Sequence, residues 1–392
     1  MLKQNYKLTM SSCFVGYIVQ AITVNLPPLL FVAFMNEFGI DLAKISFLIT
    51  FTFVIQLCID IILAGILSSK NVRILAVCAQ ISAIIGLVCL AVLPNFMENK
   101  FLALMISAFF YSGGSGLIEV VASPIVESCP NDNKSAAMSL LHSFYCWGSA
   151  LTIGISTAFF AVFGIENWRI LAIVWAIIPA IDAFAMAIMP IGEIESEKGR
   201  QSKPLKNKSF ILMLILMFVG GAAELAISQW ASAFAETGLH ISKSAGDLAG
   251  PFLFAIMMGT GRVLFTILGN KIRLINYMLM SSILCITGFA LAAFSSNPIV
   301  ALIGTALSGF AVAIMWPGTL SLASSRIGAS AAAFGMLACF GDIGCTTGPA
   351  VVGFISQKFG GSISVGLRFG MMFPVIMLIM VIVLKYKKVK AD

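Results

Sequence analysis

The stretch "IGEIESEKGRQSKPLKNKS", Ile191 to Ser209, carries mixed charge and few apolar residues, and it interrupts a chain that is otherwise mostly apolar. Six long apolar runs precede it and six follow it. Each is close to the length of about 20 residues that an α-helix needs to cross a hydrocarbon core of about 30 Å. The stretch therefore predicts two six-helix halves, residues 1–190 and 210–392, joined by a hydrophilic linker at 191–209.

The twelve expected spans are apolar runs with few charges inside them. They are Leu8 to Met35, Ile45 to Leu67, Ile74 to Leu93, Phe101 to Val126, Ala136 to Phe163, Ile170 to Met189, Phe210 to Phe234, Leu248 to Leu268, Ile275 to Phe294, Ile299 to Leu322, Ala331 to Ile355 and Val365 to Leu384.

The composition agrees with a bilayer environment. Hydrophobic residues make up 59% of the 392 residues and charged residues only 10%, too little charge to cover the surface of a water-soluble protein of this size. The alternating ten-residue segments of a membrane β-barrel are absent, so helices are the way to satisfy the backbone in lipid. The fold class predicted is an all-α membrane protein with twelve transmembrane helices in two halves.

The net charge of +7 is distributed as a topology signal. With the N-terminus taken as cytoplasmic, 17 of the 24 Lys and Arg residues fall in cytoplasmic segments and only five in outer ones. This bias places both termini and the linker on the cytoplasmic side of the inner membrane. We therefore expect the partners to be the lipid bilayer and a small molecule, not nucleic acid, and we expect a monomer.

Several chemistries lack their sequence patterns. The nine cysteines are scattered without a CxxC pair, which favours buried thiols over disulfides or metal ligands. The chain has no GxxxxGK[ST], HExxH or GxSxG motif, so neither a direct ATP drive nor a metallohydrolase or serine hydrolase is supported. We expect no cofactor, no bound metal and no enzymatic activity.

The two halves resemble each other. "SGLIEVVASP" runs from Ser115 to Pro124 in the fourth span, and "SGFAVAIMWP" runs from Ser308 to Pro317 in the tenth, with the same Ser-Gly to Pro spacing. A helical bundle with two repeated halves is typical of a secondary transporter that rocks around a central site.

The motifs "LAGILSSKNVR", "GLIEVVASPIV", "LLHSFYCWGSAL", "GTGRVL", "WPGTLSLA" and "GDIGCTTGPAVVGFISQKFG" carry a family resemblance. With the 6+6 layout, they make the chain resemble the major facilitator superfamily, and within it the fucose permease-like sugar:proton symporters. The chain departs from the pattern at Ser69, where the superfamily motif has an acidic residue. It also departs in the first span, where "VNLPPLLF" lacks the acidic residue of the sugar symporters.

Glu119 is a carboxyl group inside an apolar run. It shares a helix face with Ser112, Ser115, Gly116 and Ser123, a small and polar stripe suited to contact other helices. Burial disfavours the charged form of a carboxyl group, so such a residue can take up and release protons. The resemblance implies the same role, since the sugar symporters carry a glutamate at the matching place. The alternative is a structural ion pair or a gate.

Three other ionisable residues fall at a similar depth. Counted at about 1.5 Å per residue, Glu119 lies about 10 Å and His142 about 9 Å from the cytoplasmic end, and Asp60 and Arg262 lie at nearly the same level. For Asp60, Arg262 and His142 a structural or gating role stands beside proton coupling or substrate contact.

Nearer the midplane, amides, carboxylates and aromatic rings suit a hydroxylated solute, since amides and carboxylates exchange hydrogen bonds with hydroxyl groups and an aromatic face packs against a sugar ring. Proton-coupling candidates here are Glu224 and Asp342. Substrate-binding candidates are Gln20, Asn25, Gln56, Gln229, Trp230 and, as alternative aromatics, Trp316 and Trp147.

The sequence thus predicts a proton-coupled secondary transporter that imports a small polar solute, with a monosaccharide favoured. The first alternative is a drug or metabolite efflux antiporter of the same superfamily. A transport-inactive membrane sensor or an intramembrane enzyme is the alternative from another class.

Overall fold

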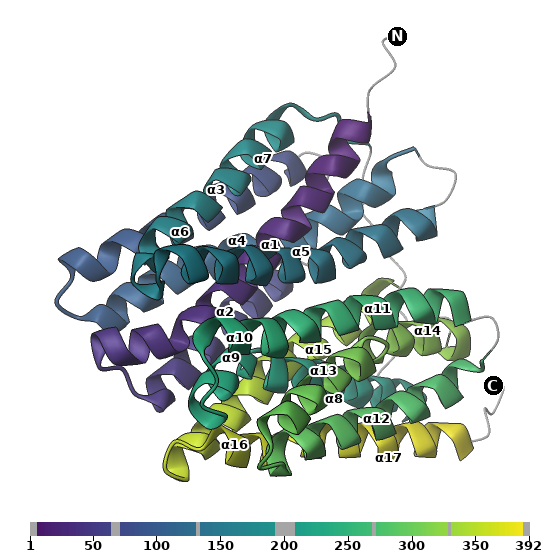
Figure 1. Ribbon diagram of the computed structural model, residues 1–392. Coiled ribbons are helices and arrows are strands. Elements are labelled where there is room, and N and C mark those ends of the chain that lie inside the picture. The colour runs from purple at the N-terminus through teal and green to yellow at the C-terminus, as the bar shows by residue number, and fades with distance from the viewer. Residues whose placement is uncertain are drawn as a thin grey trace. The chain divides into compact units, whose positions relative to one another are not determined.

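The computed structural model describes residues 6–63, 71–130, 134–192, 208–268, 272–327 and 331–386. In these residues every regular element is helical, and twelve helical segments are long and apolar enough to cross a membrane (Figure 1). The predicted all-α fold with twelve spans is confirmed.

The chain divides into two compact units. Unit 1 comprises Met1–Ile40 and Phe51–Lys198, and unit 2 comprises Asp41–Thr50 and Gly199–Asp392. The division between Lys198 and Gly199 falls within the hydrophilic stretch, of which residues 193–207 lie outside the described part of the chain. The end of the second span and Ser69, within residues 64–70, also lie outside it.

The first six spans, coloured purple to teal in Figure 1, are built from seven α-helices and one 3₁₀ turn in the described residues. They are α1 (Tyr6–Phe38), α2 (Leu42–Leu63), α3 (Val72–Phe96), α4 (Lys100–Ser128), α5 (Lys134–Phe163), η1 (Ile165–Asn167), α6 (Trp168–Trp175) and α7 (Ile177–Ile188).

The last six spans, coloured teal-green to yellow, are more often interrupted. Their elements are α8 (Lys208–Ser228), α9 (Ala231–Ala233), η3 (Phe234–Gly238), α10 (Lys243–Asp247), η4 (Leu248–Phe252), α11 (Leu253–Leu268), α12 (Leu274–Phe294), α13 (Pro298–Val312), α14 (Met315–Ile327), α15 (Ala331–Lys358), α16 (Ile363–Gly370) and α17 (Met372–Tyr386).

The sixth and twelfth spans break at the same place. α6 and α7 are separated at Ala176, and α16 and α17 at Met371. Pro179 and Pro374 each stand three residues after the break, and a proline has no N–H to bond the carbonyl four residues before it. The matching breaks support the internal repeat seen in the sequence.

Other interruptions have no counterpart among the described residues of the first half. The tenth span breaks at Ala313 and Ile314, just before Pro317, whereas α4 continues through Pro124. The seventh and eighth spans contain the π-helical turns η3 and η4. Such π turns are rare and often occur at functional sites.

Glycines let neighbouring helices approach closely. A Cβ atom added at Gly114 of α4 would lie 2.7 Å from the carbonyl oxygen of Ala79 in α3. In unit 2, one added at Gly288 of α12 would lie 2.8 Å from the carbonyl oxygen of Gly304 in α13. Small residues at helix contacts are typical of membrane bundles, where close packing and not water exclusion drives association.

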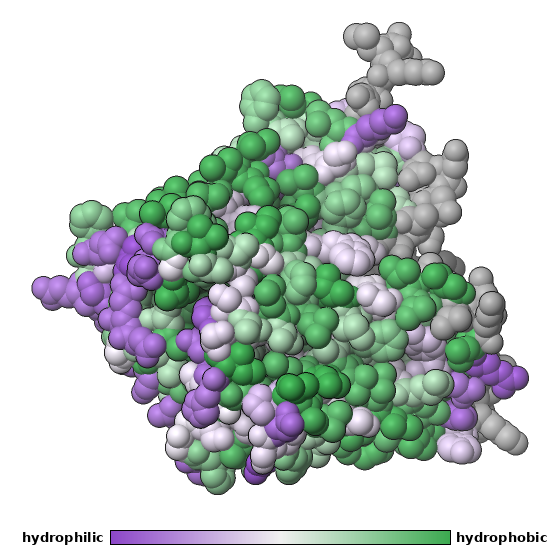
Figure 2. Space-filling view, viewed as in Figure 1, coloured by the Kyte–Doolittle hydropathy of each residue, from purple (hydrophilic) through white to green (hydrophobic). Residues whose placement is uncertain are grey.

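Apolar side chains line the outer sides of the helices. On α7, Ile177, Ile181, Phe184 and Ile188 form one exposed face, and Phe184 has 70% of its surface exposed. Figure 2 shows apolar residues along the helices on the visible face, with hydrophilic residues gathered where helices end. A surface of this kind is unsuited to water and fits a lipid environment.

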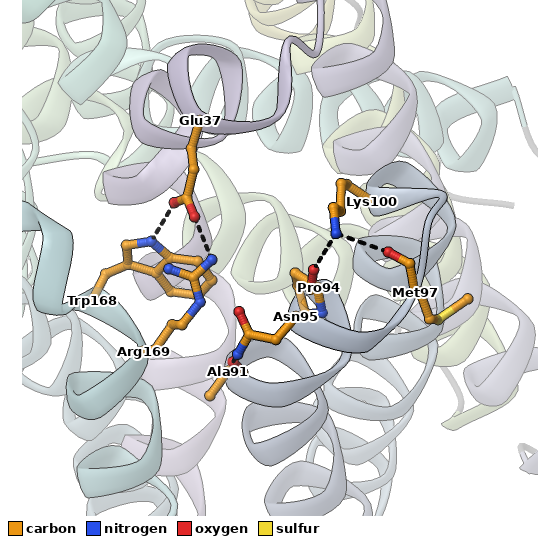
Figure 3. A network of polar contacts seen from close by, with 8 residues as sticks. All are labelled: Glu37, Ala91, Pro94, Asn95, Met97, Lys100, Trp168 and Arg169. Carbon is orange, nitrogen blue, oxygen red and sulfur yellow. Dashed lines mark hydrogen bonds and ion pairs between the residues drawn. The ribbon is translucent and has the colours of Figure 1, made fainter.

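An ion pair joins the end of α1 to the start of α6 (Figure 3). The Glu37 carboxylate accepts hydrogen bonds from the Trp168 indole, at 3.0 Å, and from Arg169, whose guanidinium lies 4.4 Å from the centre of the Trp168 ring. Nearby, the Lys100 ammonium donates to the carbonyl oxygens of Pro94 and Met97 at the end of α3.

Candidate functional site

Glu119 of α4 is hydrogen-bonded to Gln20 of α1. The Gln20 Nε2 atom donates to Glu119 Oε2 at 2.8 Å, and the glutamate side chain is half-buried. Gln20 is 7% exposed, and its Oε1 atom has no hydrogen-bond partner among the described residues. In that part of the chain Glu119 forms no ion pair. A neutral amide is therefore the partner of this carboxyl group.

Gln56 of α2 contacts α4 one helical turn before Glu119. Its Nε2 atom donates to Ser115 Oγ at 2.8 Å, and the chain is close enough that a Cβ added at Gly116 would lie 3.1 Å from the Gln56 Cα. The small and polar stripe of α4 thus contacts α1 through Glu119 and α2 through Ser115 and Gly116.

Asn25 and His142 lie on other contacts of α1 with α5. The Asn25 amide donates to Ser149 Oγ at 3.0 Å and to the carbonyl oxygen of Ala21. His142 is exposed, and its ring meets the Tyr17 ring edge-on with centroids 5.4 Å apart. Trp147, the alternative aromatic of α5, is 45% exposed.

Asp60 is half-buried near the end of α2. Unit 1 therefore holds Gln20, Asn25, Gln56, Asp60, Glu119 and His142 of the predicted residues. Among these the structure joins Gln20 directly to Glu119.

Glu224 and Arg262 both lie in unit 2. Glu224 on α8 and Arg262 on α11 are both half-buried, and Arg262 is close enough for its charge to act on the glutamate. The sequence assigned Glu224 to proton coupling and Arg262 to a gating or structural role.

Gln229 and Trp230 lie in the bend between α8 and α9, and both are buried. Trp230 has none of its surface exposed, and its Nε1 atom donates to the carbonyl oxygen of Pro349 in α15 at 2.9 Å. Its ring is therefore packed inside unit 2.

Trp316 lies at the helix break of the tenth span, two residues after Ile314, and is half-buried. A Cβ added at Gly341 of α15 would overlap its ring, so the indole covers α15 next to Asp342, which is also half-buried. Interrupted helices in transporters often carry the substrate site.

Comparison with known proteins decides the family. The family model of the Major Facilitator Superfamily matches residues 11–349. The chain belongs to the major facilitator superfamily. The expected family is thereby confirmed, and the protein is a multi-pass membrane transporter and not an enzyme. The comparison with curated proteins gave no match.

Solved transporter structures share the fold along nearly the whole chain. A variant of the Escherichia coli fucose:proton symporter FucP superposes with a TM-score of 0.66 at 14% identity, covering 97% of this chain and 99% of that one. A structure described as FucP in the outward conformation gives 0.65 at 14%, covering 95% and 98%. A variant of the nucleoside transporter NupG gives 0.72 at 17%, covering 98% and 100%.

The sequence analysis missed a third carboxyl group inside unit 1 of this transporter. Asp182 of α7 is 3% exposed; Ser12 Oγ donates to its Oδ1 at 2.6 Å and Gln80 Nε2 donates to its Oδ2 at 2.8 Å. Asp182 is the only charged residue in the predicted span Ile170 to Met189. The criterion that singled out Glu119 would therefore have found it.

A second missed cluster lies where the seventh span turns into the eighth. Asp247 is 1% exposed and accepts hydrogen bonds from Lys243, at 2.8 Å, and from Ser232, at 2.5 Å, while Glu236 lies 3.9 Å from the Lys243 ammonium. The seventh span was predicted to end at Phe234 and the eighth to begin at Leu248, so Glu236, Lys243 and Asp247 were assigned to a loop. The helix instead begins at Lys243.

Proposed function

We propose that this transporter imports a small polar solute together with a proton across the cytoplasmic membrane, with a monosaccharide as the favoured solute. Glu119 is the proton-coupling carboxyl group in this proposal. Membership of the superfamily supports secondary transport, and the site chemistry supports the coupled ion and the solute class.

The observation that carries the proposal is the partner of Glu119. A primary amide has two donor hydrogens and one acceptor oxygen. The Gln20 amide can therefore donate to the ionised carboxylate, as it does here at 2.8 Å, and can accept from the protonated acid after rotation. An ion pair would instead hold the carboxylate in its charged form.

The polar groups around this pair suit a hydroxylated solute. Gln20 Oε1 accepts no hydrogen bond from the residues that the structure describes, and a buried acceptor without a partner costs about 1–3 kcal/mol. A sugar hydroxyl group would supply that donor. Within unit 2 considered by itself, Trp316 is a better candidate than Trp230 for an aromatic contact with solute, because Trp230 is fully buried and bonded to Pro349. The names of the structural neighbours, a fucose symporter and a nucleoside transporter, point to solutes of this chemistry.

The orientation rests on the basic residues. The excess of Lys and Arg in the segments on the side of the N-terminus supports cytoplasmic termini. Asp342, Glu224, Asp60, Gln56, Asn25, Gln229 and His142 remain candidates for coupling or substrate contact in this proposal.

Uptake by proteoliposomes tests the proposal. Purified protein is reconstituted, and accumulation of radiolabelled sugars is measured with and without an inward proton gradient, with empty liposomes as the baseline. We expect at least one monosaccharide to accumulate only with the gradient. The Glu98→Gln protein is the control, because it removes an exposed carboxyl group at the α3–α4 turn and should transport normally.

Two results would overturn the proposal. Solute accumulation driven by a sodium gradient at constant pH would show that sodium, and not the proton, is the coupled ion. Loss of a preloaded hydrophobic drug from the liposomes in exchange for protons, without uptake of any sugar, would establish the efflux antiporter instead.

A further inference from the structure

Unit 1 contains the same chemical pair twice, a carboxyl group hydrogen-bonded to a primary amide. Gln20 bonds Glu119, and Gln80 bonds Asp182, both with the amide nitrogen donating at 2.8 Å. In both pairs the other end of the amide, Oε1, is buried and without a hydrogen-bond partner in the described residues.

The second pair is the more deeply buried. Asp182 is 3% exposed and Gln80 has none of its surface exposed. Asp182 points away from the exposed apolar face of α7, and its partners come from two other helices, Ser12 from α1 and Gln80 from α3. Three helices of unit 1 therefore meet at one carboxyl group.

No cation balances this carboxyl group in the described part of the chain, where Asp182 forms no ion pair. Arg73 of α3 donates instead to the carbonyl oxygens of Met186 and Ala187 at the end of α7. Other titratable or charged groups on the described parts of the helices packed against α7, or next to these groups, are Tyr6, Lys7, Cys13, Tyr17, Glu37, Cys78, Cys89, Cys129 and Arg169. Burial raises the pKa of the Cys129 thiol, just beyond α4, so that group stays neutral.

An ionised carboxyl group held only by neutral donors inside a membrane bundle lacks a compensating positive charge. The simplest ligand that supplies this charge is a proton. Gln80 Oε1, which has no hydrogen-bond partner in the described part of the chain, is the acceptor that a protonated acid requires. Rotation of the amide brings this oxygen to Asp182, because the two ends of the amide have nearly the same shape.

We propose that Asp182 is a second proton-binding site of this transporter, in which the Gln80 amide changes from donor to acceptor when the carboxyl group is protonated. The proton adds to one carboxylate oxygen, and no covalent bond breaks. Protonation then alters the contact that ties α7 to α1 and α3. The site is independent of Glu119, since Ser12 and Gln20 lie eight residues apart on α1, about 12 Å along the helix axis.

Infrared difference spectroscopy of the purified full-length protein tests this proposal. The Glu119→Gln protein removes the first carboxyl–amide pair, and the Glu119→Gln/Asp182→Asn protein removes both. Each is titrated from about pH 4 to about pH 9, a range that includes the titration of buried carboxyl groups. We expect a C=O stretching band of a protonated carboxyl group that titrates in the first protein and is lost in the second. Glu98→Gln in the same background should keep the band.

A further variant covers the case in which Asp182→Asn fails to fold. Gln80→Leu keeps the carboxyl group and removes the amide, so the band should persist at a shifted frequency, because its hydrogen bond is lost. An unchanged frequency would show that Gln80 does not bond the protonated acid. Identical titrations with and without Asp182 would show that it binds no exchangeable proton. Loss of the band on adding sodium at constant pH would identify a metal-cation site, and each of these three results overturns the proposal.

Discussion

Replacing Glu119 by glutamine separates proton coupling from a structural role. The new side chain keeps the shape of the protonated acid and can still accept the hydrogen bond that Gln20 donates at 2.8 Å. It cannot ionise. We therefore expect Glu119→Gln to hold the transporter in the equivalent of its proton-loaded form.

The structure sets the size of the accompanying stability change. A hydrogen bond to a charged group contributes about 1.5–3 kcal/mol and one between neutral groups about 0.5–1.5 kcal/mol. The substitution should therefore lower the free energy of unfolding by at most about 2.5 kcal/mol. If Glu119 were half of a buried ion pair, removing its charge would cost about 3–5 kcal/mol. Unfolding in mixed micelles distinguishes the two values.

The transport assay compares two modes on one preparation. Substrate-for-substrate exchange needs only reorientation of the loaded protein, so it should survive, whereas accumulation driven by a pH gradient should vanish. Both rates are normalised to folded protein. Gradient-driven accumulation at the unsubstituted rate would refute the reasoning and move the coupling to Asp60, Glu224 or Asp342. Equal loss of both modes together with a large loss of stability would favour a structural role.

Three shorter predictions concern topology, substrate contact and packing. A thiol introduced by Gln201→Cys in a cysteine-free background should not react with membrane-impermeant reagents in intact cells. Rapid labelling would show that the linker lies on the outer side of the membrane, opposite to the predicted topology. Trp316→Ala should weaken sugar binding about 2- to 10-fold, the worth of an aromatic contact of about 0.5–1.5 kcal/mol. Trp230→Ala should instead lower the free energy of unfolding by about 3–5 kcal/mol, as expected for a buried aromatic ring. If Trp230→Ala weakened sugar binding and left the free energy of unfolding unchanged, Trp230 would be the substrate-binding aromatic residue. Gly114→Leu should destabilise the protein by at least about 1–3 kcal/mol because it overfills a helix contact, whereas Gly335→Leu, with open space around the glycine, should unfold like the unsubstituted protein.

The sequence predicts the spans well because hydropathy measures the property that places a helix in lipid. The fourth span, predicted as Phe101 to Val126, is found as Lys100–Ser128. The eighth was predicted five residues short because Lys243 and Asp247 neutralise each other, and a hydropathy pattern counts them as two charges in a loop. Their i,i+4 spacing is that of an ion pair on one helix face, so considering the two charges together would have favoured a helix that begins at Lys243.

Partner choice is the part that sequence reasoning could not supply. The stripe on α4 identified the face of the helix that meets other helices, but not that Glu119 would meet Gln20 while Ser115 meets Gln56. The amide of Gln20 or of Gln56 is chemically able to donate a hydrogen bond to either Glu119 or Ser115. The rotation and approach of α1 and α2, set by packing along their whole lengths, decide between them.

The repeat shows which features of unit 1 belong to the shared frame and which belong to its chemistry. When Ser115 is aligned with Ser308, the residue equivalent to Glu119 is Val312, which is 1% exposed. When Pro179 is aligned with Pro374, the residue equivalent to Asp182 is Met377, which has none of its surface exposed. At both equivalent positions unit 2 has a buried side chain without a carboxyl group.

The backbone features at these positions behave differently from the side chains. The break before the proline recurs in the sixth and twelfth spans, and the glycine contact recurs between the third and fourth and between the ninth and tenth spans. Helix packing therefore requires the small residues and prolines in both units, whereas it accepts valine or methionine where unit 1 has an acid. Packing does not require Glu119 and Asp182, and burial of a carboxyl group is unfavourable; their presence in unit 1 therefore agrees with the proton-binding roles that we propose for them.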